Sequence, residues 1–210
     1  MPLIVFEGID GCGKTTQVAE LVARLRARGI AVRQLREPGG TALGEQVRTI
    51  LLDHKTRSSA VAELFGYLMA RAQLCDEVLT PGLRAGDTIV LDRFYHSTLA
   101  YQGYGLGLDV EQIRAATDLA TGGLRPDLVL WLELDPSAAQ ARRSSARGAD
   151  RIEARGLDYL GRVHAGYRRM AEAGELLAID ASRTSAEVAA AVWSHLALRL
   201  PALADRPAAS

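Results

Sequence analysis

The chain has 210 residues, and its 25 Lys and Arg side chains balance its 25 Asp and Glu side chains, so the formal net charge is zero. This balance argues against a general nucleic-acid binder or a membrane-surface binder, and no apolar run approaches the length of a membrane span. Two cysteines, and no signal-peptide pattern before the first apolar run, favour a reducing, cytoplasmic location. We therefore expect no nucleic-acid partner and no membrane partner.

A phosphate-binding pattern lies between the first predicted strand and the first predicted helix. Leu3 to Phe6 is a short apolar run with β-branched residues, which predicts a buried parallel strand. Apolar residues at i, i+3, i+4 and i+7 from Val18 to Leu25 predict a helix that ends at Gly29. The segment between them, Gly8 to Thr15, has the G-x-x-x-x-G-K-S/T spacing of a P-loop.

The residue types of this segment suit a nucleoside triphosphate. Gly8, Gly11 and Gly13 let successive backbone N–H groups point at phosphate oxygens, and the next helix adds the positive end of its dipole. Lys14 can reach the β- and γ-phosphates, and the Thr15 hydroxyl can bind Mg²⁺. An ordinary glycine turn would explain Gly8 and Gly13 but not Lys14 and Thr15. We therefore predict a nucleoside triphosphate and Mg²⁺ as the ligands of this segment.

Cys12, inside this segment, has two interpretations. It lies beside a helix N-terminus and Lys14, both of which lower a thiol pKa and favour reactivity. The alternative, which we favour, is a small side chain that fills an alanine-sized slot.

The rest of the chain alternates strands and helices. Further strands are predicted over 31–35, 88–91, 128–134 and 176–179, and helices over 43–53, 60–79, 136–145, 155–173 and 184–200. This order predicts an α/β, three-layer P-loop fold in one domain over residues 1–200, with a five-stranded parallel sheet flanked by helices and a loose tail over 201–210. Residues expected on the core side of the two helices over 43–53 and 60–79 are Val47, Ile50, Leu51, Val61, Leu64, Phe65, Leu68, Ala72, Cys75 and Leu79.

Two features outside the P-loop have both a functional and an ordinary interpretation. Asp92 and Arg93 end the third strand, at the sheet edge where α/β proteins bind ligands, and Asp92 resembles a Walker B carboxylate that organises Mg²⁺. The alternative is a strand-end cap. Tyr67 and Arg71 share a helix face and could stack on and hydrogen-bond a base, although an ordinary partly exposed pair is the better interpretation of that spacing alone.

An arginine-rich stretch follows the fourth strand. It contains Arg142, Arg143, Arg147, Arg151 and Arg155. A solvated basic face is the usual meaning of such a run. The break at 148–150 predicts instead a mobile lid over about 143–155, whose arginines could approach a transferring phosphoryl group.

Several local patterns together resemble one family. The chain contains no asparagine, so the asparagine-containing guanine motif of GTPase switches is absent. The resemblance rests on GxDGxGKTT (Gly8 to Thr16), REPGG (Arg36 to Gly40), Tyr67 with Arg71, DRF with STLAYQG (Asp92 to Gly103), RPDL (Arg125 to Leu128) and DRIE (Asp150 to Glu153). In this order they resemble bacterial thymidylate kinase over nearly the whole chain.

The resemblance implies a role for each matching residue. For the acceptor, dTMP, it implies Arg48 and Arg93 on the phosphate, Asp10 near the 3′-hydroxyl and Tyr101 against the sugar. It implies that Tyr67 stacks on thymine and that Arg71 hydrogen-bonds the base. The remaining residues of the same pocket are Glu37, Pro38, Thr98 and Gln102. For the donor it implies that Gly8, Asp10, Gly11, Cys12, Gly13, Lys14, Thr15 and Thr16 bind the ATP phosphates and that Asp92 and Thr15 bind Mg²⁺. It also implies Ser182 near adenine and Arg143 as a further ATP-binding residue. Because Gly11 stands where other members carry a basic P-loop residue, the chain resembles the type whose catalytic arginine lies in the lid, here Arg147 or Arg151. The family also forms homodimers, and the long helix is the expected contact.

The implied reaction moves the γ-phosphoryl group of ATP to dTMP and gives dTDP, with Lys14, Asp92, Arg93, Arg147 and Arg151 as the catalytic residues. Two alternatives remain. A deoxynucleoside kinase shares the P-loop and a DR motif but needs a base for a neutral hydroxyl, and the arginine pair Arg48 and Arg93 favours an acceptor that already carries phosphate. A non-catalytic ATP sensor would not need the lid arginines.

Overall fold

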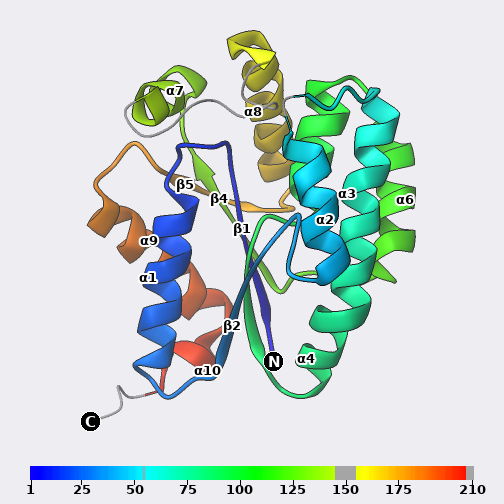
Figure 1. Cartoon of the computed structure of the whole chain (residues 1–210). Helices are drawn as coiled ribbons and strands as arrows, with labels where there is room; N and C mark the ends of the chain where they lie inside the picture. Colours follow the sequence, from blue (N-terminus) through cyan, green and yellow to red (C-terminus); the bar gives the residue numbers. More distant parts are fainter. Residues whose placement is uncertain (54, 145–154, 207–210) are drawn as a thin grey trace.

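The computed structural model describes residues 1–53, 55–144 and 155–206, and it contains one β-sheet with helices on both faces (Figure 1). The strands are β1 (Leu3–Glu7), β2 (Val32–Arg36), β3 (Thr88–Asp92), β4 (Leu128–Glu133) and β5 (Leu177–Asp180). The helices are α1 (Lys14–Arg26), α2 (Ala42–Leu52), α3 (Ala60–Leu74), α4 (Thr80–Arg84), α5 (Tyr95–Thr98), α6 (Val110–Thr121), α7 (Pro136–Ser144), α8 (Leu157–Glu172), α9 (Ser185–Arg199) and α10 (Pro201–Ala204), with π-helical segments η1 (Cys75–Leu79) and η2 (Leu99–Gly105). The strand order is β2-β3-β1-β4-β5 with every pair parallel, so the predicted α/β fold with a five-stranded parallel sheet is confirmed.

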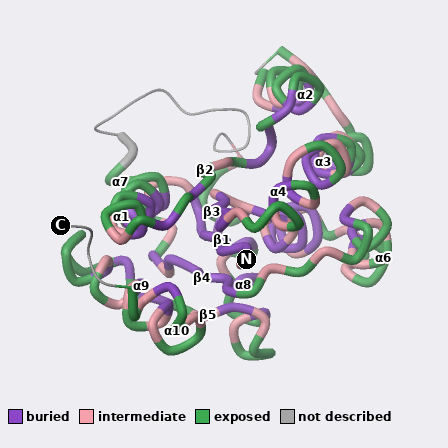
Figure 2. Tube along the Cα trace, turned by 90° about the horizontal axis from the view of Figure 1, so that it is seen from below, coloured by how far each residue is buried: buried purple, intermediate pink, exposed green. Residues whose placement is uncertain are grey.

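The central strand β1 positions the loops that matter below. All five of its residues are buried, because helices cover both faces of the sheet: α1 and α9 lie on one side, and α3, α4 and α6 on the other (Figure 2). Phe6 of β1 pairs with Asp92 of β3, so these two strands end side by side. The segments that follow them are therefore neighbours in space.

Helices α2, α3, α6 and α9 begin at residues whose side chains accept a hydrogen bond from the first turn. Thr41 accepts from the N–H of Gly44 before α2, and Ser59 accepts from the N–H of Ala62 before α3. Thr184 and Glu187 form a reciprocal capping box at α9. Each cap satisfies a backbone donor that a helix cannot satisfy by itself.

The helical structure around β3 differs from the prediction. The helix expected over 60–79 ends as an α-helix at Leu74, passes through η1 and continues as α4, which contains Pro81. The elements α5, η2 and α6 were not predicted. The first two lack a stripe of α-helical period, whereas α6 carries a readable start at Asp109 and a left-handed glycine end at Gly122.

Two further expectations are wrong. Ile50, Val61 and Phe65 are 57%, 48% and 62% exposed, although their periodicity predicted burial. The helices that carry them pack on the protein by other faces, and periodicity cannot tell a core face from an apolar outer face. The tail is not loose from its first residue, because Pro201–Ala204 forms α10 and Leu203 is buried.

Candidate functional site

The P-loop and the Asp92-Arg93 pair meet at the carboxyl edge of the sheet. The Arg93 N–H donates to the carbonyl of Phe6 at 2.9 Å, and the Thr15 hydroxyl lies 3.5 Å from Asp92 Oδ2. The two predicted motifs, 77 residues apart in sequence, therefore form one site.

The P-loop backbone requires its glycines. Gly8 has a φ of 137°, and a Cβ there would lie 2.7 Å from the carbonyl oxygen of Leu132. Gly13 has a φ of 94° and begins α1. Lys14 is buried, and its ammonium donates to the carbonyls of Gly8 at 2.9 Å and Ile9 at 3.1 Å. Lys14 thus lies against the loop whose backbone N–H groups are predicted to bind the same phosphates as Lys14.

Cys12 belongs to this loop. Its side chain is buried, and burial raises the pKa of the thiol although the charge of Lys14 opposes the shift. A buried thiol with a raised pKa is mostly protonated near neutral pH and is a poor nucleophile. The structure supports the interpretation of Cys12 as a small filling side chain.

A first cavity, the P-loop cavity, opens beside these residues, with about 940 Å³ of empty space that includes its mouth open to solvent. It is lined by Asp10, Gly11, Gly13, Lys14, Thr15, Thr16, Arg36, Glu37, Arg48, Asp92, Arg93 and Arg142. Five of these side chains are cationic, which suits a polyphosphate. Arg142 was not among the predicted binding residues; it donates to the carbonyl of Ala181 at 3.0 Å and so connects α7 to the loop after β5. The predicted Ser182 lies next in that loop, and its N–H and hydroxyl both donate to Asp180.

The residues present fit a divalent cation beside the phosphates. Asp92 Oδ1 is buried and has no hydrogen-bond partner within the described chain, and the Thr15 hydroxyl lies 3.5 Å from the other carboxylate oxygen, Oδ2. No group of three His, Cys, Asp or Glu side chains in the described ranges could hold a metal by itself. Mg²⁺ needs no such cage, because it is usually bound by one or two carboxylates together with water and substrate phosphates.

A second cavity, the Tyr67 cavity, lies between α3, η2 and the turn after β2, with about 590 Å³ of empty space that includes its mouth open to solvent. All ten predicted acceptor residues line it: Asp10, Glu37, Pro38, Arg48, Tyr67, Arg71, Arg93, Thr98, Tyr101 and Gln102. Leu52, Phe94 and Ser97 also line it and were not predicted. The last two belong to the segment after Asp92, so the DRF and STLAYQG pattern contains the signal for them.

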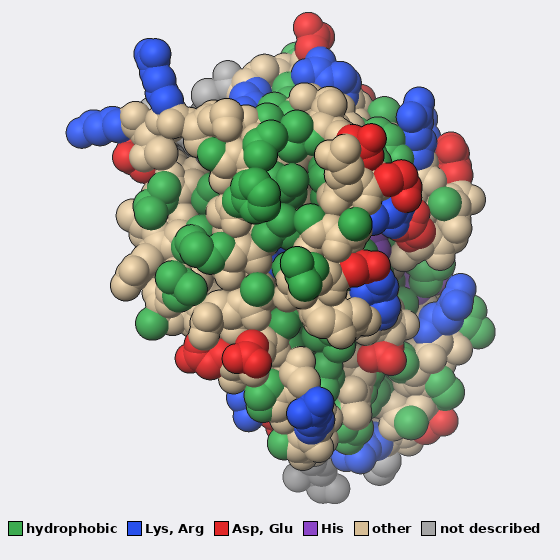
Figure 3. Space-filling view, turned by 90° about the vertical axis from the view of Figure 1, so that its right-hand side faces the viewer, with side chains coloured by type: hydrophobic (Ala, Val, Ile, Leu, Met, Phe, Trp, Pro, Cys, Tyr) green, Lys and Arg blue, Asp and Glu red, His purple; other side chains and the backbone are tan. Residues whose placement is uncertain are grey.

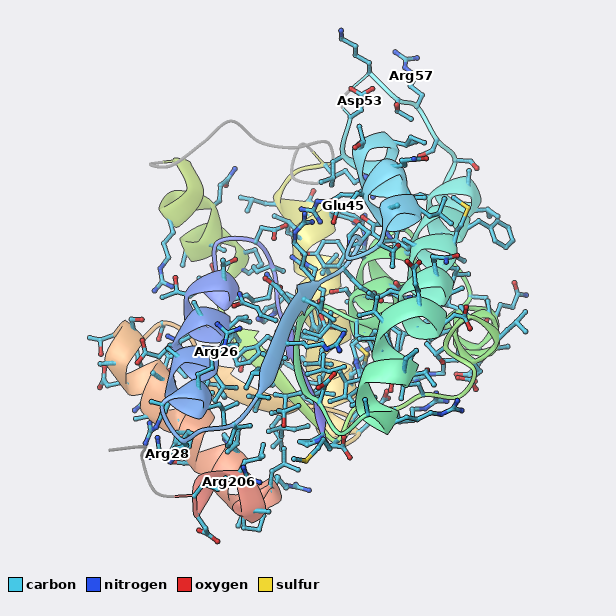
Figure 4. All side chains as sticks on the ribbon, turned by 60° about the horizontal axis from the view of Figure 1, so that its bottom comes forward. Arg26, Arg28, Glu45, Asp53, Arg57 and Arg206 are labelled. Atoms are coloured by element: carbon cyan, nitrogen blue, oxygen red, sulfur yellow. The ribbon has the colours of Figure 1, made fainter. Side chains whose placement is uncertain are left out.

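Glu45 of α2 lies beside the end of β2 (Figure 4) and fixes the turn that follows this strand. Glu45 accepts from Arg36 Nη2 at 3.0 Å and from the N–H of Gly40 at 2.9 Å. The hydrogen bond from Gly40 and the charge of Arg36 hold the pKa of Glu45 below its ordinary value. The REPGG segment is therefore a built turn, and it brings Glu37 and Pro38 to the cavity wall.

A buried ion pair forms one wall of the Tyr67 cavity. Arg71 Nε and Nη2 donate to Glu37 Oε2 at 2.9 and 2.8 Å, and Nη2 also donates to the Thr98 hydroxyl at 2.9 Å. Burial raises the pKa of Glu37, while the charge of Arg71 opposes that shift. Arg71 Nη1 and Glu37 Oε1 are buried with no hydrogen-bond partner in the described residues. The pair thus has one unused donor and one unused acceptor, on two side chains that line the cavity.

Arg93 occupies a strained backbone position. Its φ is 71°, the left-handed region that non-glycine residues rarely adopt, and such strain concentrates at functional sites. Its Nη2 donates to Asp10 Oδ1 at 2.6 Å and its Nη1 donates to the Ser97 hydroxyl at 3.0 Å. Burial lowers the pKa of Arg93, but the charges of Asp10 and its other neighbours outweigh burial and raise the pKa. The guanidinium is permanently charged.

Gln102 is hydrogen-bonded to a second buried carboxylate, that of Glu63. Its side-chain amide donates to Glu63 Oε1 at 2.9 Å, and Glu63 also accepts from Arg155 Nη2 at 2.6 Å. Arg155, the last arginine of the predicted lid, is therefore engaged by α3. Glu63 was not predicted, because a single acidic residue on a helix gives no sequence signal of burial.

The two cavities share a wall made of Asp10, Glu37, Arg48 and Arg93. Arg48 is held there by donating to the carbonyl of Pro38 at 2.9 Å. Groups bound in the two cavities would meet at this wall, between two arginines.

Comparison with known proteins identifies the family. The sequence model of the family described as thymidylate kinase matches residues 6–192. The chain belongs to the thymidylate kinase family. It is 49% identical over 200 residues to a protein named thymidylate kinase from a Synechococcus species, covering 94% of this chain and 95% of that protein. It is 43% identical over 198 residues to the thymidylate kinase of Deinococcus radiodurans, covering 93% and 96% of the two chains.

Membership of the thymidylate kinase family confirms the resemblance seen in the sequence and makes the chain a nucleoside monophosphate kinase that uses ATP. These comparisons favour neither a deoxynucleoside kinase nor a non-catalytic sensor. The predicted lid residues Arg147 and Arg151, and the side chain of Arg143, lie outside the described residues. Within the described ranges, no helix combines the length and the apolar character needed to cross a membrane.

Proposed function

We propose that this chain transfers the γ-phosphoryl group of ATP to dTMP and so forms dTDP. The observation that carries the proposal is the wall of Asp10, Glu37, Arg48 and Arg93, which the P-loop cavity and the Tyr67 cavity share. A donor with its triphosphate on the P-loop and an acceptor with its base beside Tyr67 would meet there. In phosphoryl transfer the protein contributes mainly position and charge, so this juxtaposition is the essential part.

On the donor side, Gly8 to Thr16 hold the ATP phosphates, with Lys14 turned from the loop carbonyls towards the β- and γ-oxygens. Asp92 and Thr15 hold Mg²⁺, which when bound neutralises charge on those oxygens. Ser182 lies towards adenine, and Arg143 contributes to the binding of ATP. The contact of Arg142 with the loop after β5 supports a cationic edge on that side.

On the acceptor side, thymine stacks on Tyr67, and the unused donor of Arg71 meets a carbonyl of the base. Thr98, Gln102, Glu37 and Pro38 complete the base pocket. The Tyr101 ring packs against the sugar and disfavours a ribose 2′-hydroxyl, while Asp10 accepts from the 3′-hydroxyl. Arg48 and Arg93 hold the phosphate at the shared wall.

The reaction needs no strong general base. The second pKa of a phosphate monoester is about 6, so the attacking oxygen of dTMP is largely ionised near neutral pH. The oxygen attacks the γ-phosphorus in line, and ADP leaves. Lys14, Arg48 and Arg93, joined by Arg147 or Arg151 of the lid, balance the charge that develops.

The test is ADP release with ATP and Mg²⁺ against dTMP, dUMP, the ribose form of TMP, dCMP and thymidine. We expect turnover with dTMP well above the rest. Turnover with thymidine alone would make the chain a nucleoside kinase, and tight ATP binding without turnover on any acceptor would make it a sensor.

The chain forms a homodimer in this proposal, through an apolar outer face of α3 and its neighbours. Large apolar side chains gather on that face (Figure 3). They are Ile50 of α2, Val61, Phe65 and Met69 of α3, and Leu119 of α6, exposed by 57%, 48%, 62%, 48% and 86%. Contiguous exposed apolar surface of this kind marks protein interfaces.

Phe65→Asp is expected to convert a dimer into a monomer in light scattering at micromolar concentration, because it would bury a charge in the proposed interface. Leu198→Asp, at an apolar residue of α9 that is 76% exposed, is the matched control and should stay dimeric. A monomeric parent chain would refute this interface.

Both cysteines, Cys12 and Cys75, are free and buried, which supports the reducing, cytoplasmic location proposed for the enzyme.

A further inference from the structure

Glu7, the last residue of β1, is an ionisable side chain that the proposed mechanism does not use. It is fully buried directly before the first glycine of the P-loop. Its Oε1 accepts from the N–H groups of Phe94 at 2.9 Å and Ser97 at 3.2 Å. Its Oε2 accepts from the Ser97 hydroxyl at 2.6 Å and the Tyr167 hydroxyl at 2.8 Å. Burial raises the pKa of Glu7, but the hydrogen bond from Ser97 and the charge of Arg93 favour its ionised form.

These hydrogen bonds converge on the segment that carries Arg93. The Ser97 hydroxyl has one proton to donate, and it donates this proton in the hydrogen bond of 2.6 Å to the Glu7 carboxylate. The lone pairs of that hydroxyl are then free to accept from Arg93 Nη1 at 3.0 Å. Glu7 thus sets the direction of a short relay, from Arg93 through Ser97 to the carboxylate, and at the same time caps the N-terminus of α5.

We propose that Glu7 is a positioning residue for Arg93, acting through Ser97 to hold the guanidinium at the wall that the two cavities share. The proposal rests on the assignment of Arg93 to the acceptor phosphate. The strained backbone of Arg93 needs such support, because a left-handed residue keeps its conformation only when its surroundings over-determine it. Arg93 Nη2 also donates to Asp10, which is 37% exposed, and to the Tyr101 hydroxyl at 3.4 Å, but both of these residues are themselves assigned to the acceptor sugar. Glu7 supplies the anchor that does not change when acceptor binds.

Glu7→Gln separates positioning from packing. The amide has the size of the carboxylate, and its oxygen can still accept from the two N–H groups that cap α5. Its NH₂ then faces the Ser97 and Tyr167 hydroxyls, which must accept instead of donate. The Ser97 proton then points either to Arg93, where donor faces donor, or to the Tyr167 hydroxyl 2.9 Å away, and in both cases Arg93 loses the carboxylate that orients the relay.

We expect Glu7→Gln to lower kcat/KM for dTMP about ten-fold, the scale of one hydrogen bond to a charged group, with little change in KM for ATP or in Tm. Ser97→Ala removes the relay and should lower kcat/KM for dTMP by itself, and adding Glu7→Gln to it should cost little more. In an Arg93→Ala background, Glu7→Gln should have no further effect. Glu172→Gln, at an exposed position of α8, is the matched control and should keep normal kinetics.

Three results would overturn the proposal. They are normal kinetics of Glu7→Gln, an equal loss from Glu7→Gln in the presence and absence of Arg93, and normal dTMP kinetics of Ser97→Ala, the variant that decides the matter if Glu7→Gln fails to fold. If Arg93→Ala alone leaves dTMP kinetics unchanged, it is the proposed function of Arg93 that fails, which is a distinguishable outcome.

Discussion

Arg93→Ala is expected to lower kcat/KM for dTMP by about 10²-fold or more, the scale of removing a preorganised donor from developing charge. Arg93 lines both cavities, and its permanently charged guanidinium is held between Asp10 and Ser97. Removing it leaves Arg48 as the remaining arginine of the shared wall. Steady-state kinetics with dTMP varied at saturating ATP measure the effect.

Two further variants distinguish lost charge from altered backbone. Arg93→Gly accepts the left-handed φ of 71° more easily than alanine, so it should be at least as stable as Arg93→Ala and equally inactive. Arg33→Ala is the control. It removes an arginine of β2 that is 53% exposed and paired with Asp87, and it should keep normal kinetics. Near-normal turnover of either Arg93 variant would show that the arginine does not hold the acceptor phosphate.

Arg71→Met is expected to lower the free energy of unfolding by about 3–5 kcal/mol and to abolish efficient use of dTMP. The side chains of Arg71 and Glu37 are 2% and 4% exposed, and breaking a buried pair leaves an uncompensated charge in a low-dielectric site. The same variant removes the unused Nη1 donor beside Tyr67. Denaturant unfolding measures the first effect and steady-state kinetics measure the second.

The double variant Arg71→Met with Glu37→Gln separates these effects. Replacing the orphaned carboxylate by a neutral amide should restore much of the stability, because the buried charge is gone. It should not restore dTMP turnover if Arg71 reads the base. Recovery of both stability and turnover in the double variant would mean that the pair is structural only.

The residues of the site were largely predictable because their signals are local. A P-loop needs glycines at particular positions and a Lys-Thr pair at a helix start, and these are contiguous in the chain. The carboxyl ends of parallel strands share an edge, so Asp92 and Arg93 could be assigned to the same site. The ten acceptor residues came from resemblance to a family, and the structure brings all ten to one cavity, while their individual roles remain proposals.

Burial of charge was not predictable in this way. Glu7 and Glu63 are fully buried, and nothing in the neighbouring sequence distinguishes them from exposed acidic residues. Their partners lie far along the chain: Phe94, Ser97 and Tyr167 for Glu7, and Gln102 and Arg155 for Glu63. The opposite error occurred at Phe65. Its apolar character and its place in the helical period predicted a buried side chain, but the side chain is exposed.

The sequence by itself therefore determined the fold class, the phosphate-binding loop and the family, because periodicity, glycine placement and contiguous motifs are properties of short segments. Only the tertiary structure decided that two cavities meet at Asp10, Glu37, Arg48 and Arg93, that Arg93 takes a left-handed backbone, and that Glu7 supports it through Ser97. The physical reason is that these features depend on contacts between strands and helices distant in sequence. Such contacts exist only once the sheet has formed and has excluded water from the groups that it brings together.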